Sequence, residues 1–169
     1  MTTRTPLRQL PLLEHNGKIA NQSIAICRYL AKQVKLVGKD DWEDLEIDAI
    51  VDTTMDLCLK TAFHVFEKNE KVKQAQAESL FNETIPFYLG KFDSQVKENG
   101  GYFVGGRLTW ADIFVVAMVD YMSFLIQKDL TANYPNLQIV KENVMNVPNI
   151  KAWMDTRPKN KFFTSSELK

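Results

Sequence analysis

The sequence has 169 residues, with few cysteines, glycines and prolines and no excess of charge of either sign. Two cysteines, Cys27 and Cys58, are too few for a disulfide framework, which favours reduced thiols and a cytoplasmic location. Lysine plus arginine number 21, and aspartate plus glutamate also number 21. A net charge of zero excludes the broad basic footprint of a nucleic-acid-binding protein and argues against a polybasic membrane anchor.

Long hydrophobic runs are also missing. The longest spans residues 113–119, bounded by Asp112 and Asp120, whereas a membrane-spanning helix needs about 20 apolar residues. The first residues contain no apolar segment typical of a signal peptide. The sequence therefore predicts a soluble protein without a membrane span.

The residues that are present have an ordinary globular composition, 45% hydrophobic and 25% charged. Asn16-Gly17 separates two short apolar stretches, which predicts a β-hairpin over residues 10–20. Asn21-Gln22-Ser23 then opens a helix with apolar residues on one side. These are Ile24, Ile26, Cys27, Leu30, Ala31 and Val34.

The rest of the chain has helical periodicity. It predicts long helices over residues 42–67 and 71–99, the second kinked at Pro86, and an apolar helix over 109–127. Pro135 and Pro148 mark the first turns of two shorter helices. The fold class is therefore α+β and mostly α: a hairpin and a helix, followed by a bundle of five helices. Because an isolated hairpin is only marginally stable, the sequence looks as if it starts partway through a small α/β domain.

Two local features suggest ligand binding. Gln22-Ser23 stands at a helix start, where free N–H groups and a partial positive charge attract anions. Taken alone, Ser23 is better explained as a helix cap. Leu10-Pro11 precedes the hairpin, and a cis bond there would present the Leu10 backbone to a ligand, although trans is the commoner state.

Three aspartates, Asp48, Asp52 and Asp56, recur at a spacing of four on the first long helix. They favour a solvated face over a metal site. No histidine and cysteine cluster has the spacing of a zinc site, and no glycine-rich phosphate loop is present.

Thr109 and Asp112 form a capping-box pattern, which predicts a structural role for both.

The motifs together resemble the glutathione transferases, most closely the sigma class, which includes the glutathione-dependent prostaglandin D synthases. Residues 10–17 (LPLLEHNG) and 21–30 (NQSIAICRYL) carry the resemblance. Further matches are Gly38–Trp42, Ile50–Thr53, Glu83–Pro86, Asn99–Tyr102 and Leu108–Asp112, so that the similarity extends from about Pro6 to Pro158.

The resemblance implies a truncated thioredoxin-like, glutathione-binding domain at residues 1–36, an all-α domain at 40–160 and a tail at 161–169. It implies a cis Pro11, with the Leu10 backbone pairing with the cysteinyl part of glutathione. Gln22 and Ser23 would hold the γ-glutamyl end, and Asp56 would reach the glutathione bound by the other subunit of a homodimer. Leu59 and Phe63 are candidates for the hydrophobic substrate pocket. Met55 replaces an acid of the family's cation site, so no metal is expected.

The family begins with a strand–helix–strand unit whose tyrosine stabilises the glutathione thiolate, and this sequence has no counterpart of that unit. No catalytic residue is therefore assigned, and thiolate activation should be reduced, because a free thiol has a pKa of about 8.5.

Three hypotheses about the function follow. The chain is a transferase that conjugates its co-substrate glutathione to electrophiles, or isomerises a prostaglandin-like endoperoxide. It is a non-catalytic, crystallin-like protein of the same fold. Or it is a helical domain that pairs with another chain through its hairpin edge.

Overall fold

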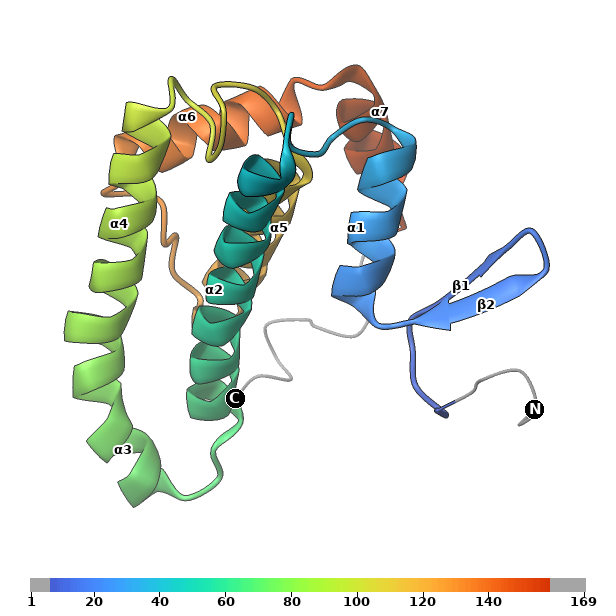
Figure 1. Cartoon of the computed structure of the whole chain (residues 1–169). Coiled ribbons are helices and arrows are strands. Elements are labelled where there is room, and N and C mark those ends of the chain that lie inside the picture. Colours follow the sequence, from blue (N-terminus) through green and yellow to red (C-terminus); the bar gives the residue numbers. More distant parts are fainter. Residues whose placement is uncertain (1–6, 159–169) are drawn as a thin grey trace.

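The computed structural model describes residues 7–158, so the predicted tail at 161–169 lies outside the described residues. A hairpin and one helix lie beside a bundle of longer helices (Figure 1). The elements in chain order are β1 (Leu12–His15), β2 (Lys18–Asn21), α1 (Ser23–Gln33), α2 (Asp41–Phe66), α3 (Glu70–Ser79), the π-helical turn η1 (Leu80–Thr84), α4 (Ile85–Glu98), α5 (Trp110–Ile126), α6 (Pro135–Met145) and α7 (Pro148–Thr156).

The predicted hairpin is confirmed. β1 and β2 pair antiparallel, with Leu12 opposite Asn21, and the turn has φ angles of 51° at Asn16 and 72° at Gly17. Positive φ at both turn residues matches the right-handed twist of the strands, which explains why Asn-Gly is preferred there. The hairpin extends away from the helical bundle, as Figure 1 shows. The hydrogen bond between His15 Nδ1 and the Tyr29 hydroxyl, 2.9 Å long, joins it to α1.

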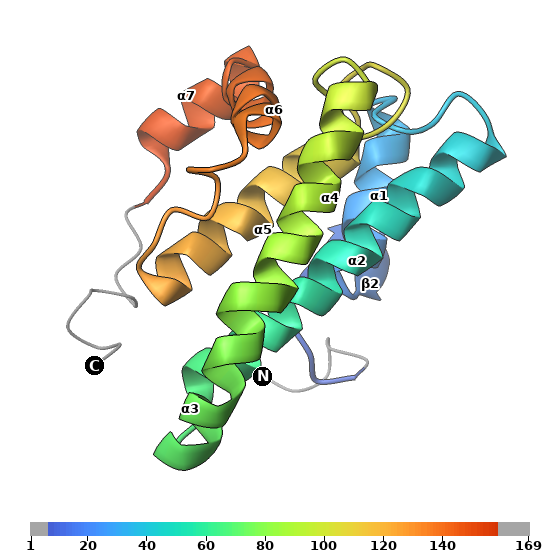
Figure 2. The same cartoon turned by 90° about the vertical axis from the view of Figure 1, so that its left-hand side faces the viewer.

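The core lies between α2 and α5. Ile47, Val51 and Leu57 of α2 are completely buried or nearly so, as are Val115 and Met122 of α5. In Figure 2, α5 lies in the middle of the bundle, with α2 on one side and α6 and α7 on the other. The apolar residues recur every three or four positions, which is how a helix buries one face. Within residues 7–158, no helix is long and apolar enough to cross a membrane.

The predicted helix over residues 71–99 is present but is divided. The Ile85 N–H donates to the Leu80 carbonyl, five residues earlier, in the π-helical turn that separates α3 from α4. The irregularity therefore begins before Pro86, the expected position of the kink. Pro86 has no N–H to donate to the carbonyl four residues earlier, and a widened turn keeps the chain helical around that missing bond.

The apolar side of α1 is buried much less than its sequence suggests. Of its residues only Ala31 is fully buried, while Leu30 is 44% exposed and Val34, at its C-terminal end, is 63% exposed. The reason is that α1 contacts β2 and α5 but has few neighbours elsewhere among the described residues.

Candidate functional site

Four of the predicted glutathione-binding residues lie at one end of the hairpin. The Leu10-Pro11 peptide bond is cis and immediately precedes β1. Leu12 pairs with Asn21, and the Asn21 side-chain amide donates to Gln9 Oε1 at 3.4 Å. These two contacts bring Leu10-Pro11 close to the chain segment that continues directly into Gln22 and Ser23.

The start of α1 differs from the simplest interpretation of the sequence. Gln22 is the N-cap residue, with φ of 77°, and no side chain caps the helix. Ser23 is the first helical residue, so the interpretation of Ser23 as a helix cap is wrong. In the described part of the chain neither side chain makes a hydrogen bond, which leaves the first N–H groups of α1 and both side chains available to a ligand.

The other predicted binding residues lie on α2. Asp56 is exposed, and no described contact joins it to the residues around Leu10 and Ser23. Leu59 is 48% exposed and Phe63 is 72% exposed, so both face open surface. Neither lines the open cleft of about 700 Å³ that lies between α5, α6 and α7 on another part of the bundle.

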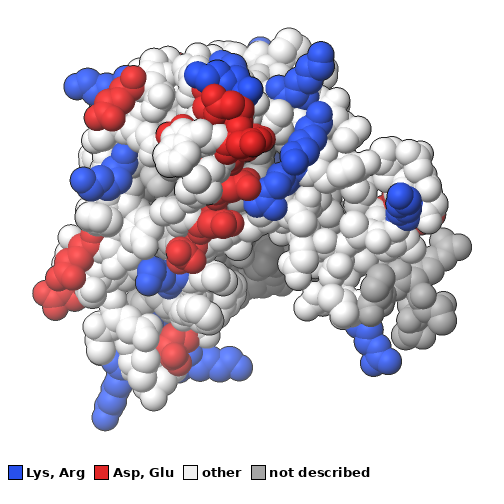
Figure 3. All heavy atoms as spheres, in the orientation of Figure 1, with Lys and Arg blue, Asp and Glu red and all other residues white. Residues whose placement is uncertain are grey.

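The acidic face of α2 is solvated, as expected, except at Asp48. Figure 3 shows acidic side chains running along α2 beside basic side chains of α1. Asp48 accepts a hydrogen bond from Arg28 Nε at 2.8 Å, whereas Asp52 and Asp56 are exposed. Among the described residues, no group of three His, Cys, Asp or Glu side chains is placed to hold a metal ion. The Arg28–Asp48 contact was not predicted, because charge spacing along one helix does not reveal a partner on another.

Thr109 and Asp112 form the capping box at the start of α5. Asp112 is completely buried and accepts hydrogen bonds from the Thr109 N–H at 2.6 Å, the Thr109 hydroxyl at 2.9 Å and the Phe103 N–H at 2.8 Å. Burial raises the pKa of Asp112, and these hydrogen bonds oppose that effect. The bond to Phe103 ties the preceding loop to the helix, a contact that the capping pattern does not predict.

A second buried carboxylate joins the chain between α1 and α2 to the loop before α5. Glu43 is bound by Arg107 Nη2 at 2.6 Å and by the Lys39 N–H at 2.9 Å. The Arg107 hydrogen bond is the main reason that the pKa of Glu43 falls to about 2. Arg107 also donates a hydrogen bond to the Val37 carbonyl at 3.2 Å. The Trp110 N–H donates to the Leu36 carbonyl at 2.9 Å. These contacts position α1 relative to the bundle.

The two cysteines are free thiols. Burial raises the pKa of both Cys27 and Cys58, which disfavours the nucleophilic thiolate at neutral pH. Neither cysteine has the surroundings of a reactive nucleophile.

Comparison with known proteins agrees with this geometry. Family models for the N-terminal and C-terminal domains of glutathione S-transferase match residues 2–32 and 55–157. A glutathione S-transferase of Anopheles gambiae is 46% identical over 153 residues, 90% of this chain and 75% of that protein. Glutathione S-transferase S1 of Drosophila melanogaster is 43% identical over 153 residues, 90% of this chain but 61% of the fly protein. The structure of prostaglandin synthase D of Nilaparvata lugens has a TM-score of 0.85 and 40% identity, covering 92% of this chain and 78% of that one.

The chain belongs to the glutathione S-transferase family. Its similarity both to insect transferases and to a prostaglandin synthase makes it a sigma-type member, as the motifs around Leu10 and Ser23 predicted. The fold class is also confirmed: a hairpin and helix typical of part of a thioredoxin-like domain, followed by a helical domain. Homologues in this family use glutathione as co-substrate, in agreement with the predicted cofactor.

Proposed function

We propose that the chain binds glutathione at the junction of the hairpin and α1, and that it transfers the glutathione thiolate to electrophilic small molecules. The observation that carries the proposal is the convergence of Leu10-Pro11 with Gln22-Ser23 in a member of this family. Residues 1–36 would then form the glutathione-binding domain and residues 40–160 the helical domain.

Each part of the site suits one part of the tripeptide. The Leu10 backbone, 83% exposed as a residue, offers an N–H and a carbonyl to the peptide groups of the cysteinyl residue. The uncapped start of α1, with the Ser23 hydroxyl and the Gln22 amide, suits the γ-glutamyl carboxylate, because helix N-termini carry a partial positive charge. In the reaction the sulfur forms a bond to the electrophilic carbon, and the leaving group departs with the electron pair of its bond.

Binding is tested first by thermal unfolding with and without glutathione. A ligand at 100 times its dissociation constant stabilises by about 2.7 kcal/mol, or about 5–11 °C for a protein of this size. We expect the shift in the wild type and its loss in Gln22→Ala/Ser23→Ala. The exposed Asp52→Ala on α2 is the control and should keep the shift. A cooperative wild-type transition that does not move in millimolar glutathione would refute the site.

Catalysis is tested separately, by following conjugation of glutathione to a chromogenic aryl halide. Conjugation that depends on Ser23 supports a transferase. A thermal shift without conjugation supports a non-catalytic, crystallin-like member of the fold. A second candidate reaction is isomerisation of a prostaglandin endoperoxide, favoured by the 40% identity to the Nilaparvata lugens prostaglandin synthase. Isomerisation of the endoperoxide in the absence of aryl-halide conjugation would favour that reaction.

We further propose that Leu59 and Phe63 contribute to the hydrophobic substrate pocket, since both are exposed apolar residues on α2. Phe63→Ala should raise KM for the electrophile and leave KM for glutathione unchanged. Phe87→Ala on α4, a phenylalanine of similar exposure, is the matched control. Equal effects of the two variants would contradict the assignment.

The proposal includes a cytoplasmic homodimer in which Asp56 contributes to the partner's glutathione site. Support comes from the two free thiols and from the exposure of Asp56, which leaves its carboxylate free to reach a second subunit. Glutathione affinity should then fall when the protein is diluted until light scattering shows monomers, and Asp56→Ala should remove that concentration dependence. Affinity that is the same in monomer and dimer would contradict the role of Asp56.

A further inference from the structure

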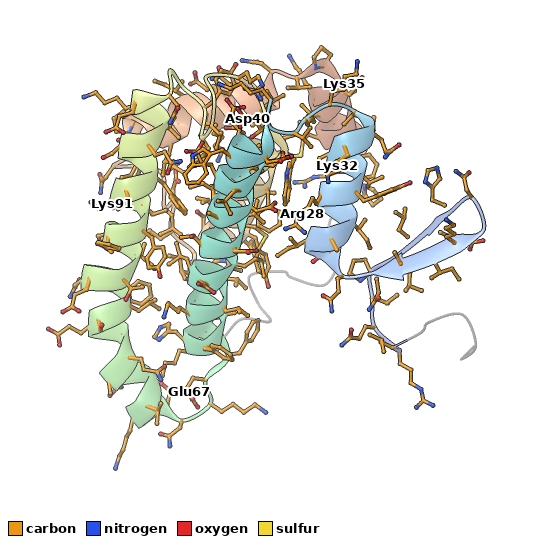
Figure 4. All side chains as sticks on the ribbon, in the orientation of Figure 1. Arg28, Lys32, Lys35, Asp40, Glu67 and Lys91 are labelled. Carbon is orange, nitrogen blue, oxygen red and sulfur yellow. The ribbon has the colours of Figure 1, made fainter. Side chains whose placement is uncertain are left out.

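Arg28 occupies a special place on α1, because it contacts two other helices. Its Nε donates to Asp48 of α2 at 2.8 Å, and its guanidinium carbon lies 5.7 Å from the centre of the Trp110 ring at the start of α5. Figure 4 shows Arg28 on the side of α1 that faces α2. In the described part of the chain, no other side-chain hydrogen bond joins α1 to α2.

These contacts matter for the position of α1, because the burial of apolar side chains holds this helix only weakly. Ala31 is its one fully buried residue, whereas the Trp110 ring that Arg28 covers is buried in the core. The Arg28 and Asp48 side chains are each 34% exposed, so water screens their hydrogen bond only partly. A planar guanidinium can donate to a carboxylate at its edge while its face covers an aromatic ring, which a lysine ammonium cannot do to the same extent.

Building on the proposed function, we infer that Arg28 is a positioning residue for the glutathione site. Arg28 follows Ser23 by five residues on α1, so fixing Arg28 against α2 and α5 fixes the direction of the helix start. Asp48 precedes Asp56 by eight residues on α2, so the same contact sets the start of α1 relative to the acidic face of α2. Arg28 acts through the position of Gln22 and Ser23 and makes no contact with the ligand.

The chain supplies a matched control. Lys32 lies one turn further along α1, carries the same charge and is exposed, with no hydrogen bond or ion pair in the described structure (Figure 4). Lys32→Met therefore removes one positive charge from α1, as Arg28→Met does, but it leaves the contacts of Arg28 with Asp48 and Trp110 intact.

The experiment measures glutathione affinity by calorimetry and, independently, the melting temperature without ligand. We expect Arg28→Met to weaken binding at least fivefold, Arg28→Lys to recover part of that loss and Lys32→Met to stay within twofold of the wild type. Asp48→Asn should weaken binding in the same direction, and it replaces Arg28→Met if the latter does not fold. A lower melting temperature with unchanged affinity would show a merely structural role and overturn the inference.

Combination with Ser23→Ala identifies the route of the effect. If Arg28 acts by positioning the start of α1, Arg28→Met should cost less affinity in the Ser23→Ala background than in the wild type. Equal losses in both backgrounds would show that Arg28 acts independently of Ser23 and would overturn the inference. A wild-type chain that does not bind glutathione would refute the proposed function itself, whereas wild-type binding that Arg28→Met leaves unchanged refutes only the role of Arg28.

Discussion

Replacing Asp112 with alanine should destabilise the protein by about 3 kcal/mol, because three buried donors lose their acceptor, at about 1 kcal/mol each. The donors are the Phe103 N–H, the Thr109 N–H and the Thr109 hydroxyl, and both residues are completely buried. The capping box alone would suggest a cost of about 1 kcal/mol. The additional cost comes from the Phe103 N–H and from burial, which prevents water from replacing the carboxylate.

The assay is thermal unfolding at neutral pH followed by circular dichroism. For a protein of this size, about 3 kcal/mol corresponds to a fall of about 6–12 °C in melting temperature. Asp112→Asn should lie between the wild type and Asp112→Ala, because an amide keeps one acceptor oxygen and the shape of the side chain. Asp52→Ala, at an exposed position of α2 without hydrogen bonds in the described structure, should shift the melting temperature by no more than about 2 °C. A fall for Asp112→Ala no larger than that for Asp52→Ala would refute the reasoning.

Burial, and to a lesser degree the charge of Lys73, lowers the pKa of His64, whose Nδ1 is buried without a hydrogen-bond partner. Below a pH of about 6.5, His64 therefore takes up a proton more readily in the unfolded chain than in the folded protein. The free energy of unfolding should decrease as the pH is lowered through this range. When the free energy of unfolding is measured in urea from pH 8 to pH 5, it should decrease less for His64→Gln than for the wild type. Equal decreases in the two proteins would contradict this prediction. Gly105→Ala should destabilise the protein more than Gly100→Ala, although both glycines have a positive φ. The new Cβ at Gly105 would meet the Arg107 guanidinium and the Glu43 carboxylate that holds it, whereas at Gly100 it would meet nothing. Equal melting temperatures would disprove the close contact.

The sequence predicted the elements well where local signals are strong. Asn16-Gly17 specified the hairpin, and apolar spacing specified the α2–α5 bundle, because turn chemistry and helical periodicity are properties of neighbouring residues. The π-helical turn before Pro86 was not predictable in the same way. Proline signals a disturbed helix but does not say whether the chain bends at that residue or widens the turn before it.

The candidate site was predicted through family motifs rather than through geometry. Taken alone, Ser23 suggested a helix cap, whereas the structure places Gln22 at the cap position with a positive φ of 77°. That conformation is unusual for a residue other than glycine, and no residue pattern in the sequence indicates it. The motif therefore supplied the candidate residues, and the structure adds that neither side chain caps the start of α1.

Contacts between distant residues were the least predictable, and several of them connect the α1 side of the molecule to the bundle. Arg107 and Glu43 are 64 residues apart, and Arg28 and Asp48 are 20 apart. Asp48 of α2 binds Arg28 of α1 directly, whereas Glu43 of α2 holds Arg107, which donates to the Val37 carbonyl in the chain after α1. Polar contacts at defined points therefore help to hold the α1 side of the molecule against the bundle. Since such contacts are directional, they determine the orientation of α1 more closely than a broad apolar face would. If glutathione binds at the start of α1, as we propose, the geometry of that site depends on a few charged residues outside it.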